Sequence, residues 1–396
     1  MSIYRYKAKT NKGQIAKGTL EAANEIELIK KLKENDLYCY EAVNSDDINF
    51  YQEKKIKTKD LVDFCYKIST MLKSGVSLSR TLMIIYESSE NKHLKKASME
   101  LYEGVQKGQS LSDTMKGMNN KFPSLLIYMI EIGESSGNLD SIMTTMSEYY
   151  DGEHKVNNKI RTAMIYPIIL GIVSVISVTF MVTFVLPQFV SMFEGNDLPM
   201  PTKILLGLSE LITTKWWLIL LLIAFAALGW TYFMKIPSFK LSIHEAKLKL
   251  PVIGKLIRTV YTYRFASSFS ILFKSGVPVL TCLEITSKVI GNAHIQNKLN
   301  TVMDGLRKGD MLSEGLAKIN VFDKMLSSMV LIGEEAGTLD ETLFSAGKFF
   351  QKEADTAIMK MVALIEPLMI VVLAIIIGFI VISIILPIYS MYTQIQ

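Results

Sequence analysis

Residues 165–186 read IYPIILGIVSVISVTFMVTFVL, a run of 22 residues without a single charge. At 1.5 Å per residue, a helix of this length reaches about 33 Å, which is enough to cross the hydrocarbon core of a bilayer. Two further segments have the same character, WWLILLLIAFAALGWTYF at 216–233 and LIEPLMIVVLAIIIGFIVISIIL at 364–386. Only the last contains a charged residue, Glu366, close enough to one end to reach the headgroup layer. The sequence therefore predicts three transmembrane helices.

The basic residues indicate how these helices are oriented. Residues 1–164 hold 24 of the 43 Lys and Arg residues and residues 234–363 hold 17, whereas residues 187–215 hold two and residues 387–396 hold none. Because Lys and Arg are enriched in cytoplasmic segments, we expect both large polar regions, with the N-terminus, to be cytoplasmic. The loop and the C-terminal tail then lie outside. No apolar segment opens the sequence, so we expect no cleaved signal peptide.

The two large polar regions contain an internal repeat. KSGV occurs at 73–76 and again at 274–277, and IGESSGNLD at 132–140 matches IGEEAGTLD at 332–340. The repeat continues into the membrane, where a YP or EP pair enters the span and an LP pair ends it. Each repeat is thus a cytoplasmic domain followed by its own span, and the span between the repeats returns the chain to the cytoplasm.

The segments between glycines in each repeat have apolar residues at helical spacing, so each repeat is expected to be a helix bundle. The glycines follow these segments, where a left-handed residue ends a helix without a Cβ clash. They are Gly75, Gly108 and Gly137 in the first repeat and Gly276, Gly309 and Gly337 in the second.

Ahead of the first repeat, the sequence predicts a small α+β domain. IYRYKAKT and QIAKGTLEA, separated by a turn at Asn11 to Gly13, are typical of a hairpin. A short helix from Asn24 to about Asn35 and a strand at LYCYEAV complete the domain.

The fold class expected is a mainly α, polytopic membrane protein with three transmembrane helices, two homologous cytoplasmic helix bundles and a small α+β N-terminal domain. The expected boundaries are 1–50 for the N-terminal domain, 57–163 for the first bundle, 165–186 for the first span, 187–215 for the outer loop, 216–233 for the second span, 234–363 for the second bundle, 364–386 for the third span and 387–396 for the tail. We expect short tethers between bundles and spans, and we expect Pro167 and Pro367 to start span helices, where a missing amide costs least.

The composition excludes several classes of protein. With 49% hydrophobic and 20% charged residues, the chain is neither disordered nor collagen-like. Three cysteines are too few for a disulfide scaffold or a structural zinc site, and a net charge of +5 without a basic stripe does not indicate nucleic-acid binding. No phosphate-binding loop and no nucleophile–base arrangement is found in the sequence, and the four histidines are scattered. We therefore expect no catalytic residues, no cofactor and no metal site.

An acidic cluster surrounds the repeated glycine turn. Its members are Glu131, Glu134 and Asp140 in the first repeat and Glu334, Glu335, Asp340 and Glu341 in the second. Carboxylates in such a turn could stabilise helix N-termini, contact basic residues of a partner, or hold a hard cation. The first interpretation is favoured, and the other two stay open.

Taken together, these motifs resemble the type II secretion system protein F family, which includes pilus assembly proteins. The resemblance rests on KSGV, KG(x)(x)LS and IGE(x)(x)G(x)LD in each repeat, on the YP and EP entries and on LPMPT at 198–202, and it covers nearly the whole chain. Carried over to this chain, the family signature falls on Gly133, Glu134, Gly137, Leu139, Asp140, Gly333, Glu334, Gly337, Leu339 and Asp340. The membrane-border pattern falls on Pro167, Pro199, Thr202, Glu366 and Pro367.

The resemblance implies a non-enzymatic platform in the bacterial cytoplasmic membrane. Such a platform couples a cytoplasmic assembly ATPase, and in some systems a retraction ATPase, to the insertion or removal of pilin or pseudopilin subunits. The partners implied are these ATPases, pilins, alignment-complex membrane proteins, lipid and further copies of the chain in a homodimer or homotetramer, with no nucleic acid. The alternative hypothesis is a secondary transporter or channel subunit, against which the lack of ionisable residues deep in the spans argues. A membrane-bound enzyme would need a reactive constellation that the sequence lacks.

Overall fold

The computed structural model describes residues 2–10, 15–22, 27, 31–33, 37–44, 55–118, 120–190, 199–234, 236–251 and 253–394. The chain divides into two compact units. One comprises residues 1–56 with 118–121, and the other comprises all remaining residues.

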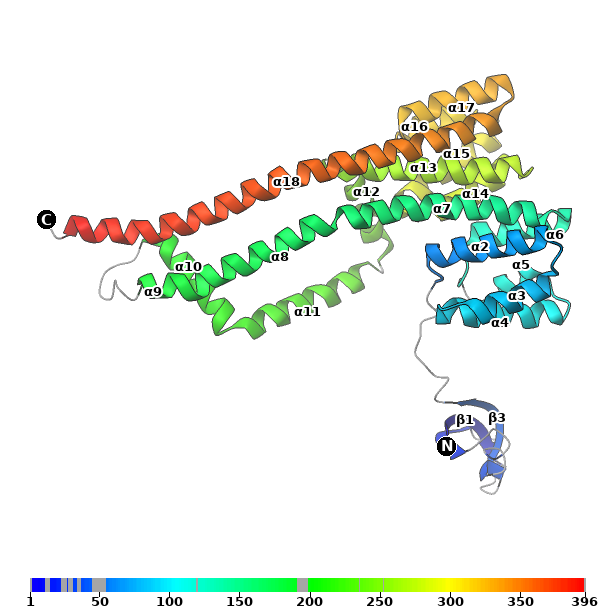
Figure 1. Ribbon diagram of the computed structural model, residues 1–396, viewed down its shortest axis with the longest axis horizontal. Helices are drawn as coiled ribbons and strands as arrows, with labels where there is room; N and C mark the ends of the chain where they lie inside the picture. Colours follow the sequence, from blue (N-terminus) through cyan, green and yellow to red (C-terminus); the bar gives the residue numbers. More distant parts are fainter. Residues whose placement is uncertain are drawn as a thin grey trace. The chain divides into compact units, whose positions relative to one another are not determined.

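The first unit contains a three-stranded antiparallel sheet in the order β2-β1-β3 (Figure 1). Its strands are β1 (Ser2–Thr10), β2 (Ile15–Ala22) and β3 (Leu37–Asn44). The predicted hairpin and third strand are confirmed, with a register shift between Lys7 and Ala8 where β1 pairs with β3. The predicted turn at 11–13 and most of the helix predicted from Asn24 to Asn35 lie outside the described residues.

The second unit contains two bundles built from the same succession of helices. The first bundle consists of α2 (Thr58–Lys73), α3 (Leu78–Ser88), α4 (Lys92–Gln106), α5 (Leu111–Lys116), α6 (Ser124–Ser136) and α7 (Leu139–Ala163). The second consists of α13 (Ile253–Lys274), α14 (Val279–Ile290), α15 (Ala293–Arg307), α16 (Leu312–Ile319), α17 (Lys324–Ala336) and α18 (Leu339–Gln394). All six glycines predicted to end helices have positive φ angles, as a left-handed C-cap requires.

The core of each bundle lies between its first and last helices, α2 with α7 and α13 with α18. Phe64 and Ile68 of α2 are completely buried, and Phe265 and Phe269 occupy the corresponding places on α13. Apolar residues three and four apart form one helix face, so each long helix can bury a continuous stripe against its partner. The two bundles of the predicted repeat are therefore present.

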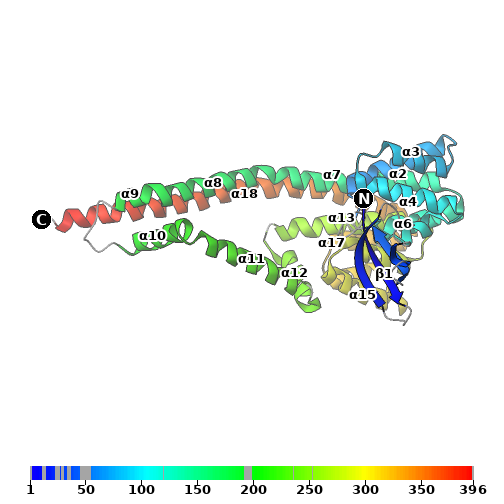
Figure 2. The ribbon, with the colours of Figure 1, turned by 90° about the horizontal axis from the view of Figure 1, so that it is seen from below.

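Among the described residues, three helices are long and apolar enough to cross a membrane, and two of them are continuous with a bundle. In the first repeat, α7 is separated by Met164 alone from α8 (Ile165–Phe180), which continues through a π-helical turn, η1 (Met181–Val185), into α9 (Leu186–Val190). In the second repeat, α18 is a single helix of 56 residues. The continuous helical segment α7–α9 of the first repeat and the helix α18 of the second form two rods. The two rods lie side by side in both views (Figures 1 and 2).

This continuity corrects two expectations. No tether separates the second bundle from its span, since the expected boundary at residues 363 and 364 falls within α18. Pro367 does not start a helix, because it lies inside α18, whereas Pro167 does lie in the first turn of α8. The helix continues through Pro367 because, in an apolar segment without water, the backbone groups must hydrogen-bond within the helix.

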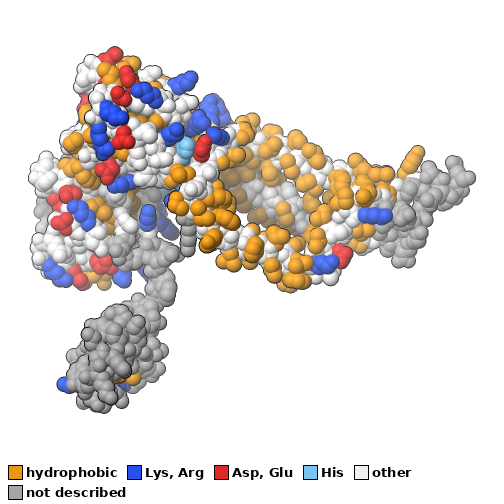
Figure 3. Space-filling model, turned by 180° about the vertical axis from the view of Figure 1, so that it is seen from behind, with side chains coloured by type: hydrophobic (Ala, Val, Ile, Leu, Met, Phe, Trp, Pro, Cys, Tyr) orange, Lys and Arg blue, Asp and Glu red, His pale blue; other side chains and the backbone are white. Residues whose placement is uncertain are grey.

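The remaining helices connect the two rods. After the first span, α10 (Met200–Thr213) leads into α11 (Trp216–Phe233), the second apolar helix, which coincides with the predicted span and buries none of its residues. Next, α12 (Pro237–Lys249) leads into the second bundle, where it contacts α13 and α15. Apolar side chains cover the spanning half, and charged side chains gather over the bundles (Figure 3).

Candidate functional site

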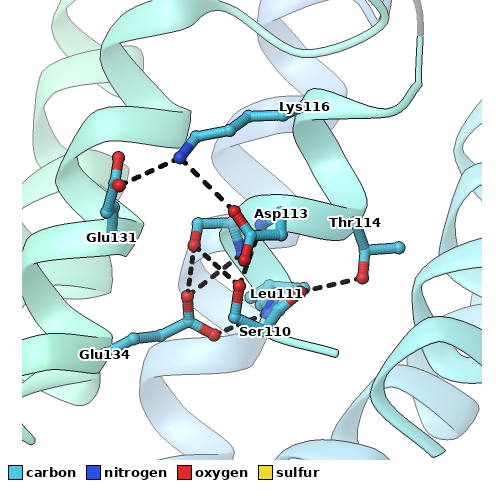
Figure 4. A network of polar contacts seen from close by, with 8 residues as sticks. Ser110, Leu111, Asp113, Thr114, Lys116, Glu131 and Glu134 are labelled. Atoms are coloured by element: carbon cyan, nitrogen blue, oxygen red, sulfur yellow. Dashed lines mark hydrogen bonds and ion pairs between the residues drawn. The ribbon is translucent and has the colours of Figure 1, made fainter. Parts of the chain in front are cut away.

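The signature glutamate of the first repeat caps a neighbouring helix. The Glu134 carboxylate, near the end of α6, accepts hydrogen bonds from the backbone N–H groups of Leu111 at 2.5 Å and Ser112 at 3.1 Å, and from the Ser112 hydroxyl at 2.6 Å (Figure 4). These two amides open α5, so no carbonyl of their own helix can accept from them. A carboxylate there satisfies both donors and stabilises the positive end of the helix dipole.

The second repeat has the same arrangement. The Glu334 carboxylate accepts from the backbone N–H of Leu312 at 2.7 Å and of Ser313 at 2.9 Å, at the start of α16. Ser112 and Ser313 are both buried, but the Ser313 hydroxyl, unlike that of Ser112, makes no hydrogen bond. The signature glutamate thus joins the same two helices in both repeats.

The signature glycines form the corner that places this glutamate. Gly137 has φ +72°, and the N–H of Asn138 bonds the carbonyl of Gly133 at 3.0 Å, which closes the end of α6. A Cβ on Gly133 would lie 3.1 Å from the Cα of Leu139, so glycine lets α7 start this close to α6 without a shift of the backbone. Gly333, Gly337 and Leu339 repeat this geometry. The φ angle of Gly337 is +69°, and a Cβ on Gly333 would lie 3.0 Å from the Cα of Leu339.

The other acidic residues lie around the corner but make different contacts. Glu131 forms an exposed ion pair with Lys116 at 2.9 Å, a hydrogen bond that raises the pKa of the lysine. Asp113 lies beside them, and hydrogen bonds from Ser110 and Lys116 lower the pKa of its carboxyl. Asp140, Asp340 and Glu341 are in the first turns of α7 and α18, as the helix-end interpretation predicts.

A cation site is not found at this corner. In the part of the chain that the structure describes, no group of three or more His, Cys, Asp or Glu side chains could hold a metal ion. The Glu134 carboxylate, the most central of the cluster, is already engaged by three donors. Both signature glutamates therefore cap helices, whereas Glu131 and Glu335 are more exposed and cap none in the described part of the chain.

The membrane-border residues do not come together in one site. Thr202, on α10, is completely buried, and its hydroxyl donates to the backbone carbonyl of Ser383 on α18 at 2.7 Å. Pro199 is the N-cap of α10. Pro167 is buried in α8, whereas Glu366 and Pro367 are exposed on α18. Among these five membrane-border residues, Thr202 forms a hydrogen bond between two separate helices.

The contact between the two bundles was not predicted. The Arg264 guanidinium on α13 bonds both carboxylate oxygens of Glu153 on α7, at 3.0 and 3.2 Å, and donates to the side-chain oxygen of Asn157 at 3.1 Å. The side chains of Arg264 and Glu153 are only 22% and 11% exposed. Burial alone would lower the pKa of Arg264, but the Glu153 carboxylate outweighs burial and the pKa is raised.

A sequence signal for this pair does exist. Glu153 follows Met146, Tyr149 and Tyr150 along the buried face of α7, so a charge interrupts an apolar stripe. The equivalent positions of the repeat do not form such a pair. Arg264 corresponds to Asp63 and Glu153 to Glu353, and both of these acidic residues are exposed. The interface is therefore asymmetric although the bundles are alike.

Comparison with known proteins agrees with this architecture. The family described as type II secretion system (T2SS), protein F, matches residues 64–187 and 265–387, and the N-terminal domain of that family matches residues 1–42. Type IV pilus assembly protein PilC of Thermus thermophilus is 31% identical over 98% of both chains. PilC of Pseudomonas aeruginosa is 30% identical over 85% of this chain and 91% of its own, and type II secretion system protein F of Vibrio cholerae is 29% identical over 99% and 98%.

Proposed function

The chain belongs to the type II secretion system protein F family, and we propose that it is the membrane platform of a type IV pilus or type II secretion machine. It is a structural component in this role, not an enzyme. Its bundles receive force from a cytoplasmic assembly ATPase, and its spans pass that force to pilin or pseudopilin subunits in the bilayer.

The continuity of bundle and span carries this proposal. Residues 339–394 form one helix, and only Met164 separates α7 from α8, so a displacement of a bundle displaces its span directly. A flexible tether would absorb such a movement, because an unstructured linker transmits little force. Two parallel rods, each fixed to one bundle, suit a part that converts cytoplasmic motion into motion within the membrane.

The proposed topology places both bundles in the cytoplasm of a bacterial inner-membrane protein. The distribution of Lys and Arg supports it, with 41 of 43 in residues 1–164 and 234–363. Residues 187–215 and the C-terminal tail then face outward. None of the residues of α11 is buried, so this helix offers an apolar surface to lipid, to pilin helices, to alignment-complex proteins or to a second copy in a dimer or tetramer.

A pair of insertions tests the role of the rods. Placing Gly-Ser-Gly-Ser-Gly-Ser-Gly after Ala363 breaks α18 between bundle and span, and we expect normal protein levels with loss of pili or of secretion. The matched control inserts Ala-Ala-Ala-Lys-Ala-Ala-Ala, which adds about two helical turns without a break. Normal assembly with the glycine insert would contradict force transmission through the rod.

The alternative of a transporter or channel predicts solute flux through liposomes that contain the protein alone. A platform gives no flux and no ATP hydrolysis by itself. A clean deletion that leaves assembly intact, with no related protein expressed, would overturn the platform function altogether.

A further inference from the structure

Five basic side chains surround two adjoining hollows where α12 meets the second bundle. One hollow, of about 310 Å³, is lined in part by Lys255, Arg258 and Lys324, and the other, of about 250 Å³, by Lys249, Arg258 and Lys298. Leu248, Arg258 and Asn320 line both, so the two hollows adjoin. Only two carboxylates, Glu245 and Asp323, line them. The surface therefore carries a clear excess of positive charge.

Most of this charge is not neutralised within the chain. Lys249 pairs with Glu245 at 2.6 Å, and the Asp323 side chain caps α17 through the N–H of Met325. Within the described ranges, Lys255, Lys298 and Lys324 make no ion pair. Three exposed ammonium groups around one depression form a site for an anion with several oxygens, because each group can donate to a different one.

Arg258 is held in position at the centre of the cluster. Its Nε donates to the carbonyl of Leu248 at 3.2 Å, which directs the planar guanidinium along the junction of α12 and α13. The turn is tight, since a Cβ on Gly254 would lie 2.5 Å from that same carbonyl oxygen. A fixed guanidinium can bind two oxygens of a phosphate at once, and its orientation is set before the anion arrives.

The cluster lies at the membrane end of its bundle. α13 runs antiparallel to α18, because a Cβ on Gly347 would lie 2.7 Å from the Ser267 hydroxyl while Ser270 bonds the carbonyl of Asp340. Counting back along α13 at 1.5 Å per residue puts Lys255 level with about residue 359 of α18. The apolar span begins near Leu364, roughly 8 Å further along. In Figure 1, α12 correspondingly lies between α11 and the bundle.

Exposed apolar side chains flank the charges. Leu250, at the end of α12, and Ile253, the first residue of α13, expose 47% and 43% of their surfaces. An apolar turn beside a basic depression, a few ångströms from the end of a span, is the arrangement by which proteins hold a lipid with its headgroup bound and its chains in the bilayer.

From these observations we infer that the hollows between α12, α13, α15 and α17 bind the phosphate headgroup of an anionic phospholipid from the leaflet on the side of the bundles. The bound lipid anchors the start of α13 to the membrane surface. This inference does not depend on the proposed platform function, because it concerns the membrane that surrounds the chain.

The test uses the full-length protein in neutral detergent, with phosphatidylglycerol as the probe and native mass spectrometry to count bound lipid. We expect phosphatidylglycerol to be retained in preference to phosphatidylcholine. The variant K255Q/R258Q/K324Q should bind phosphatidylglycerol at least about tenfold more weakly. The matched control R80Q/K92Q/K107Q removes the same charge from exposed positions of the first bundle and should bind as the unaltered protein does.

Two further measurements distinguish the outcomes. The charge-conserving variant K255R/R258K/K324R should keep at least part of the affinity, which separates loss of charge from loss of folding. Displacement of the lipid by inorganic phosphate at millimolar concentration would show a site for a soluble anion and overturn the inference. Retention of phosphatidylglycerol by K255Q/R258Q/K324Q equal to that of the unaltered protein would also overturn it.

Discussion

The hydroxyl of Thr202 supplies the hydrogen bond that Pro387 withholds from the carbonyl of Ser383. In a regular helix, this carbonyl accepts from the N–H four residues on, but residue 387 is proline and has none. Thr202 Oγ1 donates to it at 2.7 Å instead, and both Thr202 and Ser383 are completely buried. A loop helix is thereby fastened to the third span at a backbone carbonyl that has no donor within its own helix.

Thr202→Val keeps the shape of the side chain and removes the donor, which leaves a buried carbonyl unpaired. We expect a loss of about 1 to 2 kcal/mol in the free energy of unfolding, seen as a lower melting temperature in detergent. Thr213→Val, on the same helix, is the matched control, because the Thr213 hydroxyl only bonds the carbonyl of Ser209 within α10. In a Pro387→Ala background the new N–H serves Ser383, so Thr202→Val should cost much less. An equal cost in both backgrounds would contradict the relationship.

Glu134→Ala removes the cap from α5 and leaves two backbone amides and a hydroxyl without their acceptor. The expected loss is about 2 kcal/mol in the free energy of unfolding, with a smaller loss for Glu134→Gln, whose amide oxygen can still accept. Glu131→Gln on the same helix breaks only an exposed ion pair and should cost less than about 1 kcal/mol. Circular-dichroism melting curves of the three variants provide the comparison.

Charge reversal at the same positions separates capping from partner binding. Glu134→Lys and Glu334→Lys place a cation at a helix N-terminus, so we expect lower thermal stability. If the two glutamates contacted the ATPase instead, the variants would lose ATPase binding in a pull-down while melting normally. Unchanged ATPase binding at a temperature where the variants stay folded would support the structural role.

Arg264→Met leaves the Glu153 carboxylate buried between the bundles without its partner. We expect a loss of about 1 to 3 kcal/mol in the free energy of unfolding and faster proteolysis between the two bundles. The double variant Glu153→Gln with Arg264→Met should recover part of the loss, since no charge is then left unpaired. Lys159→Gln breaks the more exposed pair with Asp355 and is the control, with an expected cost below about 1 kcal/mol.

His244 makes the docking of α12 dependent on pH. Its Nδ1 accepts the N–H of Ala293 at 2.9 Å, which requires an unprotonated nitrogen. Burial lowers the pKa of His244, and the charges of Lys247 and Lys240 lower it further. A lowered pKa in the folded state means that the contribution to stability is complete above the unfolded value of about 6.5 and is lost as the pH falls below it.

Melting temperatures measured between about pH 7.5 and pH 5 should therefore decline for the unaltered protein. They should decline less for His244→Ala, whose stability at pH 7.5 should already be lower because Ala293 has lost its acceptor. Parallel pH curves for the unaltered protein and His244→Ala would contradict the prediction.

Much of this protein follows from the order of its residues. Uncharged runs and repeated motifs were enough to predict three spans, two similar bundles and the family, because hydrophobicity and helix-ending glycines act locally. The positions of the helix-ending glycines were likewise predictable, since a positive φ angle is a property of a single residue.

Only the tertiary structure decided how these parts are joined. Pro367 lies within α18, whereas Pro167, at the same place in the first repeat, lies in the first turn of α8, so the pattern around the proline does not decide which of the two occurs. The role of Glu134 depends on two amides 22 and 23 residues away, and the partner of Thr202 is 181 residues away. Hydrogen bonds between helices need positions in space, which the linear spacing of residues does not contain.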